Sequence, residues 1–143
     1  MLSLGSPLAS SSPTQLHHNL QTIAPNGKPT RILNINFQSV LKNREAFASI
    51  PSSIGYDIVT GTESWLTNNK KDNEIFPPGY TIYRIDIETG QRGGGVFIAI
   101  NKDLVSTRYQ SAETQCEIVW AKIEIKSCKP LLIGSYYRPH ASD

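Results

Sequence analysis

One stretch, residues 57–66, constrains the fold more than any other part of this sequence. It reads Asp-Ile-Val-Thr-Gly-Thr-Glu-Ser-Trp-Leu. Apolar and β-branched residues are followed by the small residues Gly61 and Thr62, and Glu63 stands at the end. This composition predicts a mostly buried strand. A carboxylate at the C-terminal end of such a strand has two interpretations. It is either a solvated residue or a charged group held rigidly at the mouth of a cleft.

A second stretch, upstream of the first, favours the cleft. Asn34 and Asn36 alternate there with the apolar residues Leu33, Ile35 and Phe37. A period of two puts both amides on one face of a single strand. Asparagine is depleted in strands, so two of them on one face need a reason.

The segment between these strands, residues 41–50, predicts a helix. Asn43 is a suitable N-cap, and Leu41, Phe47 and Ile50 are spaced to form an apolar stripe. Strand, helix and strand in this order predict a βαβ unit with parallel strands. Such a unit would bring the ends of the two strands together.

The rest of the chain predicts further strands joined by polar turns. Residues 67–74 are polar throughout and predict an exposed loop or one helical turn. On the longest later strand, Val119, Ala121, Ile123 and Ile125 form an apolar face that should meet the core. The predicted strands are residues 80–85, 96–100, 104–109, 116–126 and 131–137.

Three consecutive glycines, residues 93–95, have two interpretations. A phosphate-binding loop needs glycines spaced to open a helix, but a predicted strand follows here. We therefore interpret these glycines as a bulge or a close approach of backbones. Arg92 beside them could still contact a phosphate, because a guanidinium group presents a fork of donors.

Several motifs, taken in order, carry a family resemblance. Leu-Asn-Ile-Asn at residues 33–36, a helix, and Thr-Glu-Ser-Trp-Leu at residues 62–66 resemble the start of the endonuclease/exonuclease/phosphatase domain. The likeness is in particular to the apurinic-endonuclease-like domain of LINE-type (non-LTR) retrotransposons, and it runs from about Arg31 to the last residue. The later motifs are Phe-Pro-Pro-Gly-Tyr at 76–80, Arg-Gly-Gly-Gly-Val at 92–96, Cys-Glu-Ile-Val-Trp at 116–120 and Gly-Ser-Tyr-Tyr-Arg-Pro at 134–139.

The resemblance implies an α/β fold, a two-sheet β-sandwich with flanking helices of the deoxyribonuclease-I-like kind. This chain would supply its N-terminal half. It also implies a magnesium-dependent phosphodiesterase, with manganese as a substitute, that nicks target DNA during retrotransposition. A hard cation of this kind takes oxygen ligands and keeps several waters. No membrane partner and no small-molecule cofactor are implied.

The resemblance also assigns roles to individual residues. Glu63 matches the metal-binding carboxylate, and Asn36 falls near the metal and the DNA phosphate. Asn34 matches the amide at the scissile phosphate, and Tyr137 matches a tyrosine that approaches the same phosphate. We therefore expect Asn34, Glu63 and Tyr137 to be catalytic, Glu63 and Asn36 to bind metal, and Asn36, Arg92 and Arg138 to contact phosphate or DNA.

The sequence departs from the family pattern near its end. The family continues with a Gly-Asp-x-Asn motif and an Asp-His ending, and this sequence stops at Asp143 without them. His140 lacks the flanking motif and is expected to be a surface residue. We therefore expect the chain to carry the metal half of the site without the base half, and to be inactive alone. The alternative is a non-catalytic retroelement remnant with at most weak nucleic-acid binding.

Length and composition set the remaining bounds. At 143 residues with a net charge of +2, the chain is one domain at most, and its charge alone does not argue for DNA binding. Residues 1–28 predict a disordered leader, in which His17 and His18 are solvated, and residues 29–143 a partial domain. Cys116 and Cys128 are expected to be free thiols. We expect an intracellular protein, nuclear if its element is active, that can self-associate through an uncovered sheet.

Overall fold

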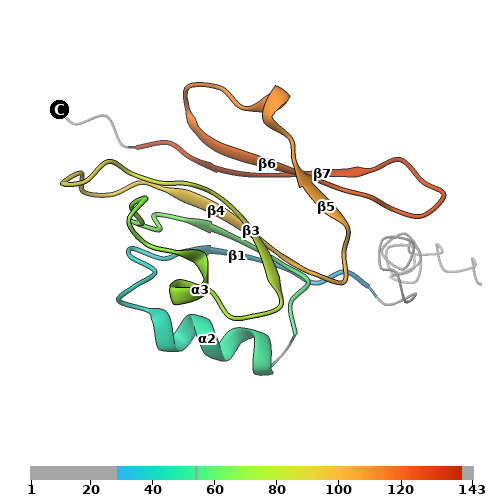
Figure 1. The fold of residues 1–143 in the computed structure, drawn as a ribbon, viewed down its shortest axis with the longest axis horizontal. Helices are drawn as coiled ribbons and strands as arrows, with labels where there is room; N and C mark the ends of the chain where they lie inside the picture. The colour runs from blue at the N-terminus through green and yellow to red at the C-terminus, as the bar shows by residue number, and fades with distance from the viewer. Residues whose placement is uncertain (1–28, 54, 140–143) are drawn as a thin grey trace, which may run out of the picture.

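The computed structural model describes residues 29–53 and 55–139. These residues form two packed β-sheets with two helices on the outer face of the first sheet (Figure 1). The predicted leader, His17, His18 and His140 lie outside the described residues. The expected α/β sandwich is confirmed.

The first sheet has four strands in the order β1-β2-β4-β3. Strands β1 and β2 are parallel, with Asn34 opposite Thr60 and Asn36 opposite Thr62. Helix α2 (Arg44–Ser53) connects them, so the predicted βαβ unit is confirmed. The strands are β1 (Ile32–Asn36), β2 (Ile58–Thr62), β3 (Tyr80–Ile85) and β4 (Val96–Asn101), with α3 (Asp72–Ile75) between β2 and β3.

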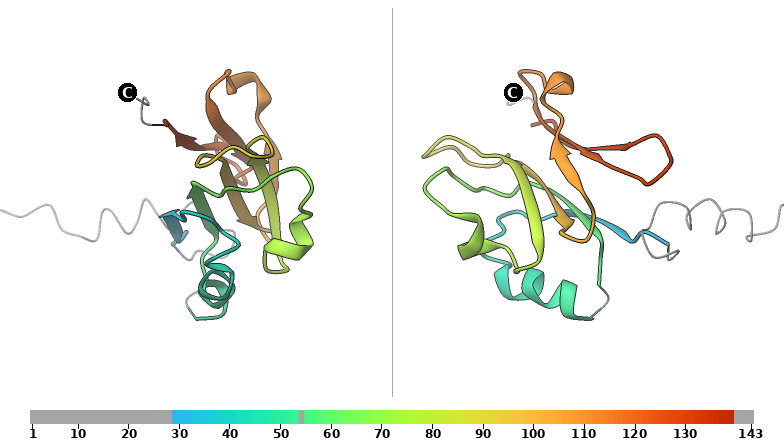
Figure 2. Two further views of the ribbon diagram at one scale, coloured as in Figure 1. Left: turned by 90° about the vertical axis from the view of Figure 1, so that its left-hand side faces the viewer. Right: turned by 45° about the vertical axis from the view of Figure 1, so that its right-hand side comes forward.

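The second sheet is antiparallel, in the order β5-β6-β7, and packs face to face on the first (Figure 2). Its strands are β5 (Ser106–Arg108), β6 (Glu117–Ile123) and β7 (Leu131–Tyr137), with the 3-10 helix η1 (Gln110–Ala112) between β5 and β6. Strand β1 is an edge strand of the first sheet, and β7 is an edge strand of the second sheet on the same side of the sandwich. A groove runs between these two strands. Among the described residues, no strand pairs with the outer edge of β1 or of β7 on this side of the sandwich.

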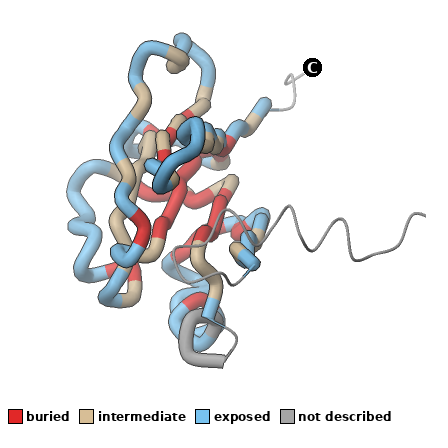
Figure 3. The backbone as a smooth tube through the Cα atoms, turned by 90° about the vertical axis from the view of Figure 1, so that its right-hand side faces the viewer, coloured by how far each residue is buried: buried red, intermediate tan, exposed pale blue. Residues whose placement is uncertain are grey.

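The buried apolar residues form two separate clusters. Figure 3 shows the buried positions along the backbone. Between the sheets, the predicted face of β6 buries Val119, Ala121 and Ile123 against β4. On the outer face of the first sheet, four aromatic rings pack with centroids 5.0–5.9 Å apart. These rings belong to Phe37, Phe47, Phe76 and Phe97. Helix α2 contributes Phe47 to this cluster.

The predicted start of the helix at residue 41 is wrong, and β5 and β6 are shorter than the predicted strands 104–109 and 116–126. Helix α2 begins at Arg44, and Leu41 lies before it with 43% of its surface exposed, so Leu41 is not part of an apolar stripe. Asn43 directly precedes the helix, but its side-chain amide donates to the carbonyls of Phe37 and Ser39 instead of capping helical N–H groups. It thereby ties the end of β1 to the start of α2.

Strand β7 is less buried than the sequence predicts. Leu132 and Tyr136 are 44% and 51% exposed, and Ser135 is the buried residue of the strand. The outward-facing side chains of β7 have no further layer of described residues over them. Within the described residues, no helix has the length and apolar character needed to cross a membrane.

Candidate active site

The segments that follow β1 and β2 stay paired beyond the ends of the strands. The N–H of Phe37 donates to the carbonyl of Thr62 at 2.9 Å, and that of Ser39 donates to Glu63 at 2.9 Å. Val40 continues the pairing by donating to Ser64 at 3.0 Å. Glu63 is thus held at the carboxyl edge of the two parallel strands, as the sequence predicts.

The backbone is strained around Glu63. Its φ is +51°, and Trp65 has a φ of +56°, both in the left-handed region. A non-glycine residue in this region costs on the order of 1–2 kcal/mol and persists only where its surroundings impose it. Such residues are concentrated at functional sites.

The surroundings that impose this conformation are the glycine loop, defined here as residues 93–95. Its carbonyls at Gly95 and Gly94 accept the N–H groups of Ser64 and Trp65, each at 3.1 Å. A Cβ atom added to Gly95 would lie 2.4 Å from Ser64 Oγ, so only glycine permits this approach. The glycines are a close backbone contact followed by β4, as predicted, and not a phosphate-binding turn that opens a helix.

Asn36 and Glu63 meet at the edge of the sheet. Asn36 Nδ2 donates to Glu63 Oε1 at 3.2 Å. This contact orients the carboxylate and leaves the amide oxygen of Asn36 available on the exposed side of β1. Both groups are hard oxygen donors of the kind that magnesium prefers.

Tyr137, the last residue of β7, brings a hydroxyl group to the same carboxylate. Burial raises the pKa of the Tyr137 phenol, and the charge of Glu63, a hydrogen bond to its carboxylate and the charge of Glu117 raise it further. A phenol is protonated at neutral pH even at its ordinary pKa of about 10, and the shift acts in the same direction, so Tyr137 is a hydrogen-bond donor there. Three of the predicted site residues, Asn36, Glu63 and Tyr137, therefore converge.

Asn34 occupies the same face of β1 but has a different partner. Its Oδ1 accepts the hydroxyl of Thr60 at 3.0 Å. The two residues line one end of a groove of about 300 Å³ between β1, β2 and β7. The shared face of Asn34 and Asn36 is confirmed, and Asn34 does not contact Glu63.

The two predicted arginine contacts lie at the periphery. Arg92 directly precedes the glycine loop, and Arg138 directly follows Tyr137; both are exposed. Their contact with phosphate stays a prediction.

The donor set fits a magnesium site with one anionic ligand. Within the described residues, no group of three or more His, Cys, Asp and Glu side chains is arranged to hold a metal. Magnesium is commonly bound by one or two carboxylates together with substrate phosphates and several waters, and Glu63 offers one carboxylate with Asn36 beside it. Cys116 and Cys128 are free and exposed, as expected, and take no part in it.

Three residues near the site were not identified from the sequence. Thr60 could have been found, because period two puts it on the same face as Asn34. Lys42 Nζ lies 5.4 Å from the centroid of the Trp65 ring, a contact between two loops. Ser135 donates across the sheets to the carbonyl of Gly61 at 3.0 Å. These two contacts depend on tertiary placement.

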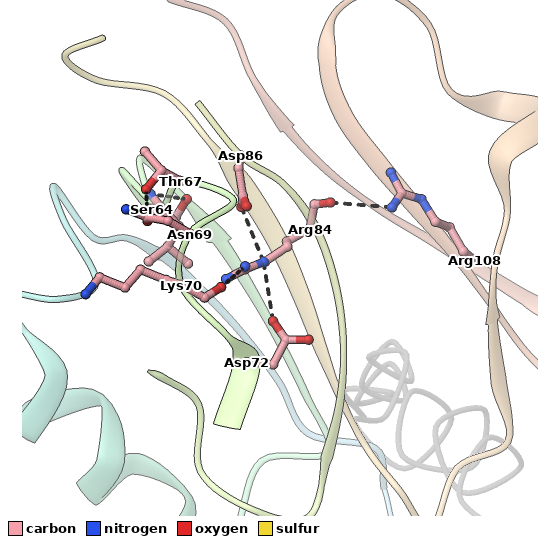
Figure 4. Close-up of polar contacts among 9 residues, drawn as sticks. Ser64, Thr67, Asn69, Lys70, Asp72, Arg84, Asp86 and Arg108 are labelled. Carbon is pink, nitrogen blue, oxygen red and sulfur yellow. Dashed lines mark hydrogen bonds and ion pairs between the residues drawn. The ribbon is translucent and has the colours of Figure 1, made fainter. Parts of the chain in front are cut away.

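A second polar cluster, around Arg84 of β3, is structural. Arg84 Nε lies 3.3 Å from Asp72 and 3.4 Å from Asp86, and its guanidinium also donates to the carbonyl of Lys70 (Figure 4). Burial raises the pKa of the Asp86 carboxyl, Arg84 lowers it and Asp72 raises it. Arg108 of β5 donates to the carbonyl of Arg84 at 3.5 Å. The cluster fastens the segment before α3 to both sheets.

Solved nuclease structures share this architecture. The endonuclease domain of TRAS1, a telomere-specific non-LTR retrotransposon, matches with a TM-score of 0.57 and 18% identity, over 80% of this chain and 47% of that one. The AP endonuclease LMAP from Leishmania major matches with a TM-score of 0.59 and 11% identity, over 76% of this chain and 40% of that one. The fold of this chain is therefore similar to that of part of an apurinic-endonuclease-like domain. The resemblance predicted from the sequence is confirmed at this level.

The nuclease-like fold is established by these structures and not by sequence matches. No family model matches the chain, and no curated protein matches it. The chain spans less than half the length of either nuclease structure.

Proposed function

We propose that this chain forms the N-terminal half of a metal-dependent endonuclease domain that nicks DNA, of the type carried by non-LTR retrotransposons. The observation that carries the proposal is the convergence of Asn36, Glu63 and Tyr137 at the carboxyl edge of β1 and β2. A lone carboxylate in a strained backbone, held by an amide and a phenol, is unusual for a residue that only packs. The nuclease fold of the neighbours supports the same reading.

Each residue has a chemical role in the proposal. Glu63 and the amide oxygen of Asn36 would hold Mg²⁺, or Mn²⁺ in its place. A bound ion of this kind polarises a phosphodiester and stabilises charge on the leaving oxygen. Tyr137, protonated at neutral pH, and the amide of Asn34 would donate hydrogen bonds to phosphate oxygens. Arg92 and Arg138 would contact neighbouring phosphates of the DNA.

Water activation is the part that the described residues do not supply. All three histidines lie outside them. General base catalysis contributes roughly a hundred- to ten-thousand-fold to rate. We therefore expect the 143-residue chain alone to nick supercoiled plasmid no faster than background.

The side of the sandwich formed by β1 and β7 supports the proposal that this chain is half of a domain. Ile32 of β1 and Tyr136 of β7 are 50% and 51% exposed beside the groove, and no strand in the described part of the chain pairs with the outer edge of either strand. Exposed edges with apolar side chains favour association. We propose that further strands of a complete domain cover this side, and that the chain alone self-associates through it.

Plasmid nicking by a longer chain tests the proposed function. A protein that joins residues 29–139 to the remainder of such a domain should nick supercoiled plasmid in magnesium, and Glu63→Ala should abolish nicking. Glu124→Ala, at an exposed carboxylate beyond β6, is the matched control and should keep full activity. Equal nicking by wild type and Glu63→Ala would contradict the proposal. The protein would need to reach chromosomal DNA, so the proposal also places it in the nucleus.

One observation favours a second candidate, a non-catalytic remnant that binds nucleic acid weakly. The described residues hold no cluster of three metal-binding side chains. If this candidate is correct, the longer chain binds DNA without nicking it, and Glu63→Ala leaves that binding unchanged.

A further inference from the structure

Glu117, the first residue of β6, lies against the glycine loop. Its Oε2 accepts the N–H of Gly95 at 2.8 Å. Its Oε1 approaches Gly94 so closely that a Cβ atom there would lie 2.6 Å from it. A half-buried carboxylate that accepts a backbone N–H makes a charge-assisted hydrogen bond, which is stronger than a neutral one.

The glycine loop is in turn hydrogen-bonded to the residues that follow Glu63. The carbonyl of Gly95 accepts the N–H of Ser64, and that of Gly94 accepts the N–H of Trp65. The two donors directly follow Glu63, a residue in the left-handed region whose own carbonyl accepts the N–H of Ser39. A continuous series of hydrogen bonds therefore joins the carboxylate of Glu117 to the backbone of Glu63.

Glu117 is also tied to the third member of the site. It lies directly opposite Tyr137 in the register of β6 and β7. Glu117 therefore lies between the glycine loop, which its side chain contacts, and the end of β7, with which its backbone is in register. Glu117 thus contacts the glycine loop, which holds the backbone next to Glu63. It also lies opposite Tyr137, whose hydroxyl group interacts with Glu63.

We propose that Glu117 is a positioning residue for this site: its carboxylate fixes the glycine loop, and the loop holds Glu63 in the orientation that meets Asn36 and Tyr137. The role of the site rests on the proposed function, but the positioning of Glu63 does not require metal or activity. Glu117 itself touches neither substrate nor metal in this account.

Amide hydrogen exchange in the 143-residue chain tests the proposal. Glu117→Ala removes the acceptor, so the amides of Gly95, Ser64 and Trp65 should exchange faster by on the order of tenfold. The amide of Ser39 is the decisive reporter, because it lies beyond Glu63 and donates to its carbonyl. If Glu117 only stabilised its own loop, Ser39 would keep its wild-type rate.

Two further variants make the result specific. Glu117→Gln retains an oxygen that can accept the N–H of Gly95 and should restore exchange at all four amides to within about threefold of wild type. Glu124→Ala removes a carboxylate that pairs with Lys122 at 2.9 Å, away from the loop, and should leave all four amides unchanged. An unchanged Ser39 amide in Glu117→Ala, or failure of Glu117→Gln to restore exchange, overturns the proposal.

Manganese separates this inference from the proposed function. If the proposed function is correct, Mn²⁺ broadens the signals around Glu63 in wild type, and Glu117→Ala weakens this effect. If wild type shows no Mn²⁺ response while the four amides respond as predicted, the proposed function is wrong and the positioning of Glu63 by Glu117 stands.

Discussion

Asn36 Nδ2 lies 3.2 Å from Glu63 Oε1, although the two residues are 27 positions apart and belong to different segments. The contact exists because β1 and β2 are parallel and in register, with Asn36 opposite Thr62, so that both chains reach the same sheet edge together. Tyr137 arrives at this carboxylate from the second sheet. The predictions below follow from these relationships.

The phenol of Tyr137 should report directly on the charge of Glu63. Burial, the charge of Glu63 and the hydrogen bond to it all raise the phenol pKa. Glu63→Gln removes the charge, so the Tyr137 pKa should fall toward the ordinary tyrosine value of about 10. NMR of tyrosine labelled with ¹³C at Cζ measures this titration. A Tyr137 midpoint that is the same in wild type and Glu63→Gln would contradict the contact.

The same shift predicts a pH dependence of stability. A phenol whose folded pKa is raised stabilises the fold fully below its unfolded pKa, and this contribution is lost as pH rises through the folded pKa. The free energy of unfolding should therefore fall above about pH 10, and less steeply in Tyr137→Phe. Tyr80, whose pKa is also raised, by burial and by Asp57, contributes the same sign in both proteins. Denaturant titrations from pH 8 to 11 check this.

A methyl group at Gly61 should disrupt the first sheet. A Cβ atom there would lie 2.1 Å from the ring of Phe97, which is fully buried among the other aromatic rings. Overpacking of this kind typically costs roughly 1–3 kcal/mol. Urea denaturation should show Gly61→Ala destabilised by about that amount.

A double variant provides the control for this prediction. Phe97→Leu withdraws the ring, so Gly61→Ala should cost less in the Phe97→Leu background than in wild type. Strict additivity of the two changes would show that the ring contact is not the cause.

The open side of the sandwich should make the chain associate with itself. Leu132 and Tyr136 project from the edge strand β7 with about half of their surface exposed. Sedimentation velocity should show species larger than a monomer at micromolar concentrations, and Leu132→Lys with Tyr136→Lys should shift the protein toward the monomer. Val105→Lys, at an apolar residue outside β7 that is even more exposed (67%), is the control and should leave the association unchanged. A wild-type monomer across this range would contradict the prediction.

Local pattern predicted much of this fold. Alternation along β1 placed Asn34 and Asn36 on one face, and the run ending at Glu63 predicted a buried strand with a carboxylate at its tip. Residues 80–85 form β3 with the predicted bounds. These features depend on side-chain period within one segment, which a single sequence carries.

The remainder depends on contacts between distant segments. Glu117 is important because β6 lies beside the glycine loop, and no spacing in the sequence encodes that neighbour. Leu41 fits a helical stripe by spacing, yet the chain turns before α2 begins. Strand β7 is apolar enough to be buried, but burial also requires a covering layer, which the described residues do not provide.

The most direct test of the central claim is Mn²⁺ binding followed by paramagnetic broadening in wild type and Glu63→Gln. This substitution keeps the shape of the side chain and removes its charge. In wild type, broadening should concentrate on the side-chain amide of Asn36 and the backbone amides next to Glu63; in Glu63→Gln it should disappear, while Glu124→Gln behaves as wild type. Equal broadening of the Asn36 amide in wild type and Glu63→Gln would contradict the account and return Glu63 to a solvated residue at the end of a strand.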